Sequence, residues 1–277
     1  MLQRTQQPRR PGLTLIELIV VLVVLVALAG ILVVSLPSML GRAHTASGAT
    51  NIGEVTKFVQ VYEQLYQSHP TDLDALTDTT STAIPDYLPS HGGTVLGGPT
   101  VVTSHPLTDE QAEALEHAGI TRLAPMHPSR GDFTAANTPT FNPYSGPSVN
   151  VAEDVRVLRL SEAFVEGASG LVSEADQVNT FGDVYILLGF GKRCSMVGKV
   201  TTEPPTHFGD SAEENAANVY SRVGLVYRVS RGAGTSGSPV SADMKRAVFI
   251  GAVGLHGDGP VGGGAHIEEY YNITRAQ

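Results

Sequence analysis

The sequence predicts an α+β protein in which one long N-terminal helix packs against an antiparallel β-sheet. Three features support this prediction: an uncharged apolar run over residues 18–36, a helical periodicity over residues 50–67, and several strand-like runs between residues 154 and 253. With 277 residues, the chain is long enough to bury a sizeable hydrophobic core.

The excess of acidic residues argues against a nucleic-acid partner. There are 27 acidic and 18 basic residues, a formal net charge of −9. Binding to nucleic acid needs clustered Lys and Arg against the phosphates, so we expect no nucleic-acid partner. The single cysteine, Cys194, excludes an intramolecular disulfide. Residues 1–12 carry three arginines and no acid, and a cationic head before an apolar run is a targeting or topology signal.

The apolar run over residues 18–36 has 19 residues without a charge. A helix needs about 20 such residues to cross the hydrocarbon core of a membrane. Together with the apolar residues before it, the run predicts a transmembrane helix over residues 13–36. Because the arginines precede it, we expect a cytoplasmic N-terminus and a head outside the cytoplasm.

Three kinds of N-terminal segment fit this pattern, and Glu17 distinguishes them. A plain signal anchor is the first, and a secretory signal peptide cut after residues 27–29 (Ala-Leu-Ala) is the second. A carboxylate inside a bilayer costs about 2.5–3.5 kcal/mol, and neither of these two segments gains anything from it. The third is a leader whose processing creates a partner for Glu17.

Residues 12–18 read GLTLIEL and resemble the cleavage and methylation motif of type IV prepilins and type II secretion pseudopilins. The resemblance implies that a prepilin peptidase cuts between Gly12 and Leu13 and methylates the new amine of Leu13. The family's usual first mature residue is Phe, so Leu13 is a departure. In the family the glutamate is paired with the terminal amine of a neighbouring subunit, which implies an assembly role for Glu17. Such a pair largely cancels two charges that are each costly alone.

The resemblance also implies a pilin-like fold with four parts. Residues 1–12 are the leader, 13–36 the transmembrane and filament-core helix, 37–67 an amphipathic helix that continues into the head, and 68–277 the extracytoplasmic head. The second helical part is supported independently by apolar residues at spacings of three and four. These are Ile52, Val55, Val59, Tyr62 and Tyr66.

The head is predicted to contain one short helix and an antiparallel sheet. Thr108 and Gln111 form a capping box at the start of the helix, and Gly119 marks its end. Residues 90–107 are rich in Gly, Ser, Thr and Pro and are predicted to be loop. Strand-like runs cover residues 154–160, 183–190, 195–200, 219–230 and 246–253.

Two short motifs resemble parts of enzymes but lack the rest of the chemistry. Residues 234–239 (GTSGSP) are similar to the nucleophile loop of trypsin-like proteases, yet Thr235 replaces the usual aspartate and no histidine stands in the matching setting. Residues 189–192 (GFGK) lack the other positions of a phosphate-binding loop and are predicted to end a strand. We therefore expect no enzymatic activity.

The C-terminal stretch offers a weak calcium site and no other cofactor site. Its carboxylates are Asp258, Glu268 and Glu269. Calcium takes six to eight oxygen ligands, and the spacing of these three matches no defined calcium loop. A glycine-rich surface loop is the simpler interpretation of residues 255–272.

We expect a structural subunit of a type II secretion or type IV pilus-like filament, which prepilin peptidase processes and which associates with itself and with other pilins or pseudopilins. Residues 69–78 are similar to the stretch after the long helix of major pseudopilins, which favours the secretion type. The expected location is the bacterial inner membrane, crossed once, with the head in the periplasm. The alternatives are a pilin or minor pilin in adhesion, motility or DNA uptake, and a secreted or anchored enzyme or binding protein with an ordinary signal.

Overall fold

The computed structural model describes residues 15–91, 93–132, 142–165, 171, 182–206, 219–233, 241–256 and 259–262. By its internal contacts the chain divides into two units, Met1–Ala43 and His44–Gln277. The helices are α1 (Leu15–Tyr66), α2 (Asp109–Ala118) and the 3₁₀ helix η1 (Arg130–Asp132). The strands are β1 (Leu73–Asp74), β2 (Ser90–His91), β3 (Thr94–Val95), β4 (Val102–Pro106), β5 (Arg122–Ala124), β6 (Val149–Asn150), β7 (Arg156–Leu160), β8 (Val184–Gly189), β9 (Val223–Gly232), β10 (Ser241–His256) and β11 (Gly259–Gly262).

The part of α1 in the second unit buries one face, as the spacing of its apolar residues predicts. Ile52, Val55 and Val59 are at most 3% exposed and belong to the hydrophobic core. Tyr66 is the exception, because 47% of it is exposed. The helix ends where Gln67 takes a positive φ of 55°, a conformation that cannot continue a right-handed helix.

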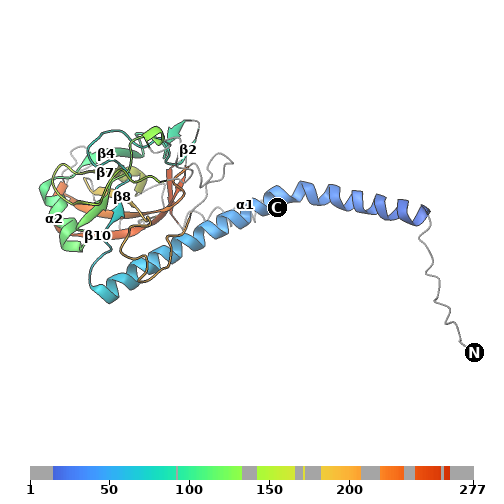
Figure 1. Cartoon of the computed structure of the whole chain (residues 1–277), viewed down its shortest axis with the longest axis horizontal. Helices are drawn as coiled ribbons and strands as arrows, with labels where there is room; N and C mark the ends of the chain where they lie inside the picture. The colour runs from blue at the N-terminus through green and yellow to red at the C-terminus, as the bar shows by residue number, and fades with distance from the viewer. Residues whose placement is uncertain are drawn as a thin grey trace, which may run out of the picture. The chain divides into compact units, whose positions relative to one another are not determined.

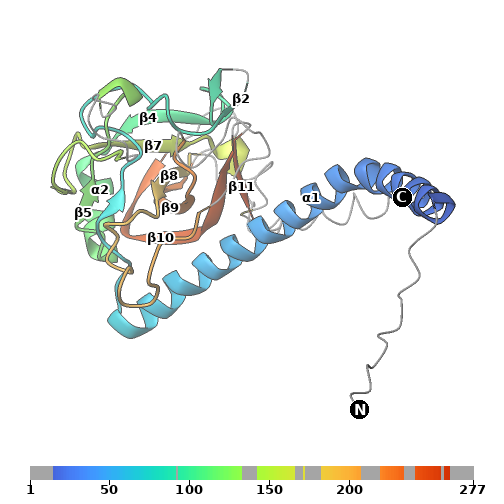
Figure 2. The same ribbon diagram turned by 45° about the vertical axis from the view of Figure 1, so that its right-hand side comes forward.

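The sheet has nine strands within the described residues, and it is mixed. Its main path runs in the order β11-β10-β9-β8-β1-β5-β6, with β7 pairing with β8 and β4 pairing with β7. Figure 1 shows β4, β7, β8 and β10 in one layered head, with α2 beside them, and Figure 2 shows the curl of the sheet. Along one edge of β8 the partner changes from β7 to β1, which joins it only at Gly189.

Both faces of the sheet are covered, and β8 shows this most clearly because all six of its residues are buried. Val184, Ile186 and Leu188 pack into the core cluster that contains the buried faces of α1 and α2. Tyr185 and Leu187 point the other way into a second cluster. Alternate residues of a strand face opposite sides, so the unbroken apolar run of β8 marks a central strand.

Helix α2 is defined by its caps, which confirms the prediction from the sequence. The Thr108 hydroxyl accepts a hydrogen bond from the Gln111 backbone, and the Gln111 side chain accepts one from the Thr108 backbone. Gly119 has a φ of 98° and ends the helix. A Cβ at Gly119 would lie 2.5 Å from that of Ser68, so the chain after α1 passes directly over this cap.

The predicted pilin-like fold class is wrong in its sheet. Strands β1 and β5 pair in parallel, with Leu73 opposite Leu123, whereas the prediction was an antiparallel sheet. Parallel neighbours need a long crossover, and the connection from β1 to β5 contains α2. The two strands are two and three residues long, too short to produce a recognisable alternation in the sequence.

Two local predictions are also wrong. Residues 195–200 were predicted to be a strand, but they form turns with a single bridge between Val197 and Thr201. Residues 90–107 were predicted to be loop, but they contain β2, β3 and β4. Strand β4 is stabilised by its register with β7, in which Val102 lies opposite Leu160. Such pairing depends on residues distant in the sequence.

Within the described residues, no helix has an apolar stretch long enough to span a membrane. This finding contradicts the predicted transmembrane segment over residues 13–36, the single-pass inner-membrane location and the orientation of the two ends.

Candidate functional site

The structure describes one of the residues that the sequence predicts to be functional. Glu17 lies in the first turn of α1 and is exposed. The processing residues Gly12 and Leu13 lie outside the described residues, and so do the calcium candidates Asp258, Glu268 and Glu269. In the described ranges, no group of three or more His, Cys, Asp or Glu side chains could hold a metal ion. The predicted residues are therefore not brought together into one described site.

The first turns of α1 form an exposed apolar surface around the helix. Twelve large apolar side chains are each at least 50% exposed, with a maximum of 78% at Leu15. They are Leu15, Ile16, Leu18, Ile19, Val20, Val21, Leu22, Val23, Val24, Leu25, Val26 and Leu28. A helix that is hydrophobic on all sides is stable when something apolar surrounds it. We call this set the apolar surface of α1.

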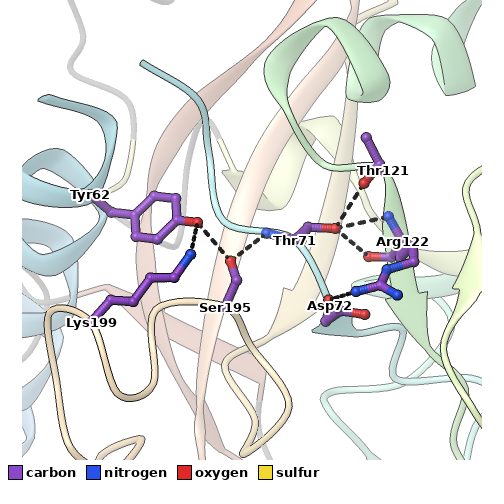
Figure 3. A network of polar contacts seen from close by, with 7 residues as sticks. All are labelled: Tyr62, Thr71, Asp72, Thr121, Arg122, Ser195 and Lys199. Carbon is purple, nitrogen blue, oxygen red and sulfur yellow. Dashed lines mark hydrogen bonds and ion pairs between the residues drawn. The ribbon is translucent and has the colours of Figure 1, made fainter. Parts of the chain in front are cut away.

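A network of polar contacts joins the other end of α1 to the sheet (Figure 3). The Tyr62 and Ser195 hydroxyls share a hydrogen bond of 3.0 Å, and the Thr71 backbone N–H donates to the same Ser195 hydroxyl at 3.0 Å. Lys199 donates to the Tyr62 hydroxyl at 3.4 Å and lies over the ring of Tyr66, 4.6 Å from its centre. The loop that follows β8 therefore holds the last turns of α1.

The same network continues into β5. The Thr71 hydroxyl accepts a hydrogen bond from the Arg122 backbone at 2.9 Å and lies 3.3 Å from the Thr121 hydroxyl (Figure 3). Arg122 forms an ion pair of 2.6 Å with Asp72. Half of the Arg122 side chain is exposed, so we assign this pair a modest stabilising role. Together these contacts make a joint between α1, β1 and β5.

Asp74 is the centre of a second, buried polar cluster. Its carboxyl group is fully buried in β1, at the point where β1 meets β8. The Tyr220 hydroxyl donates to Asp74 Oδ2, and the Tyr144 hydroxyl donates to the same oxygen at 3.4 Å. Arg193 stacks on the Tyr144 ring, 4.1 Å from its centre. The cluster joins β1, the end of β8, the residues before β9 and a loop before β6.

The electrostatics of Asp74 differ from those of Asp183, a buried carboxylate that lies directly before β8. Asp183 forms an ion pair of 3.2 Å with Arg228. Asp74 has no such pair among the described residues, and its Oδ1 has no hydrogen-bond partner there. Burial raises the pKa of Asp74 to about 6, against the lowering effects of the Tyr220 hydroxyl and the more distant Arg222 charge. Asp74 is therefore a carboxyl group that holds its proton unusually well.

The Asp74 cluster is suited to fastening strands rather than to binding a ligand. Gly191 is buried against the Asp74 carboxylate, and a Cβ at that position would overlap it. Tyr220 is 1% exposed and covers Gly189, where a Cβ would overlap the hydroxyl. The sequence contained a signal for this cluster: an aspartate inside the apolar stretch around residues 73–76 and two glycines at 189 and 191.

Comparison with known proteins identifies no relative. No family model matches the chain, and no curated protein or solved structure matches it either. The functional argument therefore depends on the residues and their geometry. The apolar surface of α1 is the described feature that most requires a partner, and the two polar clusters stabilise the second unit.

Proposed function

We propose that the chain is a structural subunit of a filament of the type II secretion or type IV pilus kind. In this proposal a prepilin peptidase cuts the chain after Gly12, and copies then polymerise through the apolar surface of α1. The observation that carries the proposal is the exposure of twelve large apolar side chains at the N-terminal end of one helix. The proposal depends on this surface and on the motif over residues 12–18, and it does not include a pilin-like fold.

The size of the apolar surface is consistent with assembly. Full burial of one Leu, Val or Ile side chain contributes about 1.5–3 kcal/mol. Burial of half of the exposed set would contribute on the order of 10–20 kcal/mol per copy. Association costs about 4–15 kcal/mol in lost freedom of motion. A bundle of equivalent helices would therefore be favourable, and each copy would supply both the surface and its cover.

Glu17 would set the register of this assembly. It is the acidic residue of the first turn of α1, next to a surface that is otherwise apolar. A lone carboxylate between packed helices is costly, whereas a paired one costs much less. Cleavage after Gly12 would create an amine at Leu13, and the Leu13 amine of a neighbouring copy would pair with Glu17. Helices out of register would lose this pair.

Replacing Glu17 with valine is expected to leave cleavage intact and to reduce polymer yield at least tenfold, because the register-setting pair is lost while the Leu13 amine stays unpaired. The measurement is the amount of processed chain that sediments as polymer. Glu54→Val is the matched control, since Glu54 is exposed in the second unit's part of α1 and lies away from the apolar surface. Equal polymer yields from the two variants would refute the role of Glu17.

A further inference from the structure

His69 lies at a junction of four elements directly after α1. It is 4% exposed, although histidine is a polar residue. Its backbone N–H donates to the Ala118 carbonyl in the last turn of α2 at 2.7 Å. Its ring meets the Tyr227 ring of β9 edge-on, with centres 5.4 Å apart, and lies 6.3 Å from the Phe249 ring of β10. His69 therefore fastens the end of α1 to both α2 and the sheet.

The ring of His69 is poorly supplied with polar partners. Its Nδ1 is buried and has no hydrogen-bond partner among the described residues, and the same holds for the neighbouring Tyr227 hydroxyl. In a neutral imidazole the unpaired nitrogen is an acceptor without a proton, and leaving it buried without a partner costs about 1–3 kcal/mol. A protonated ring would bury a second N–H and a full charge among two aromatic rings, which is far less favourable.

The charges around His69 do not offset a proton on its ring. Glu63 of α1 lies 3.7 Å from the His69 Nε2, but the same carboxylate oxygen also accepts from Arg246 of β10 at 3.0 Å. The charged groups that act on His69 are these two, with opposite effects. Strand β9 contributes the Tyr227 ring, and α2 contributes the Ala118 carbonyl. Arg246 thus weakens the support that Glu63 gives to a protonated ring, and burial outweighs what remains.

We infer that His69 is a pH-sensitive latch: the neutral ring holds the end of α1 on the sheet, and protonation releases it. The latch would control how firmly α1 is joined to the body of the protein. The inference goes beyond the proposed function and does not depend on it, because the latch lies within one copy of the chain.

The direction of the effect follows from linkage. Burial lowers the pKa of His69 from 6.5, against the raising effect of Glu63. The closed state therefore binds the proton more weakly than the open state does. Closure is fully favourable above pH 6.5, and it weakens as the pH falls below that value until the closed-state pKa is reached. Within that window the closed-to-open ratio falls by up to about tenfold per pH unit.

Hydrogen exchange of the full chain at pH 7.5 and 5.5 tests the latch. After correction for intrinsic rates, we expect protection of residues 52–66 to fall, by up to about tenfold, relative to residues 184–189 of β8. In His69→Phe, which keeps an aromatic ring between Tyr227 and Phe249, this relative fall should disappear. His91→Phe, at an exposed histidine, is the matched control and should behave like the wild type.

Two charge variants give effects of opposite sign, which a merely structural role would not produce. Arg246→Gln frees Glu63 to pair with a protonated His69, so the acid-induced loss of protection should become smaller. Glu63→Gln removes an anion that favours the proton, so the loss should become larger. The quantity compared is the difference between the two pH values, so a uniform loosening of the joint does not affect it.

Three results would overturn the inference. One is an equal loss of protection in residues 52–66 and in β8, which means global unfolding. Another is a His69→Phe variant with the same acid response as the wild type. The third is that Arg246→Gln and Glu63→Gln both lose protection in acid to the same extent as the wild type. These two charge variants also decide the question if His69→Phe does not fold.

Discussion

Replacing Gly191 with alanine is expected to lower the free energy of unfolding by about 3–5 kcal/mol. The added Cβ would overlap the buried Asp74 carboxylate, so either the chain after β8 or the carboxylate must move. Overpacking alone costs about 1–3 kcal/mol, and displacing Asp74 also disturbs its hydrogen bonds from Tyr220 and Tyr144. Chemical denaturation of the full chain measures the change.

Two controls separate this cause from a general effect of replacing a glycine. Gly53 lies in α1 with open space at its Cβ position, so Gly53→Ala should stabilise by about 0.5–1 kcal/mol. In an Asp74→Ala background the overlapping carboxylate is absent, and Gly191→Ala should cost much less there. An arbitrary substitution typically costs about 1 kcal/mol. If the free energy of unfolding of Gly191→Ala lies within about 1 kcal/mol of the wild-type value, the close approach of residue 191 to the Asp74 carboxylate is contradicted.

Replacing Asp74 with asparagine is expected to remove a pH-dependent loss of stability on the order of 3 kcal/mol. The folded-state pKa of Asp74 is about 6, compared with an ordinary value of 3.8. Between these values the folded chain keeps a proton that the unfolded chain gives up. Stability from this group is therefore highest at low pH and falls as the pH rises from about 4 to about 6. Each pH unit in that window corresponds to about 1.4 kcal/mol.

The measurement for Asp74 is the free energy of unfolding of wild type and Asp74→Asn at pH 4 and pH 7. The two curves must be compared by difference, because His69 acts in the opposite direction below pH 6.5. We expect the wild type to lose stability relative to Asp74→Asn between pH 4 and pH 7. A difference that stays constant across this range would show that folding does not raise the pKa of Asp74.

Regular elements of the head could be predicted from the sequence because their signals are local. The capping box of Thr108 and Gln111 defines α2 without reference to the rest of the chain. Residues 183–190 and 219–230 are apolar and β-branched, and they contain β8 and most of β9. The buried face of α1 follows from its three-and-four spacing up to Tyr62. Tyr66 stays outside because its ring stacks with Tyr62 and Lys199 at the surface.

The features that could not be predicted depend on contacts between distant residues. Strands β1 and β5 are short, and they are strands only through their pairing with each other and with β8 and β6. The Asp74 cluster brings together residues 74, 144, 191 and 220, whose spacing has no period. The sequence around His69 has no pattern that predicts which residues its ring contacts. Its latch geometry depends on β9, β10 and α2.

The membrane prediction failed for a different reason. It counted uncharged residues up to position 36 and added the apolar residues before Glu17. This count reaches the number of residues that a membrane-spanning helix needs. Among the described residues, no helix is long and apolar enough to cross a membrane. The apolar surface of α1 is exposed, and under the proposed function neighbouring copies of the chain would cover it.

Mass spectrometry of the mature N-terminus tests the central claim most directly, because processing after Gly12 creates the amine that the proposed assembly uses. The account predicts a chain that begins at Leu13 and carries a methyl group on its amine. A chain that begins at Gly30 would show an ordinary signal peptide and would remove the apolar surface of α1 with it. An uncut chain that still begins at Met1 would contradict the account as well.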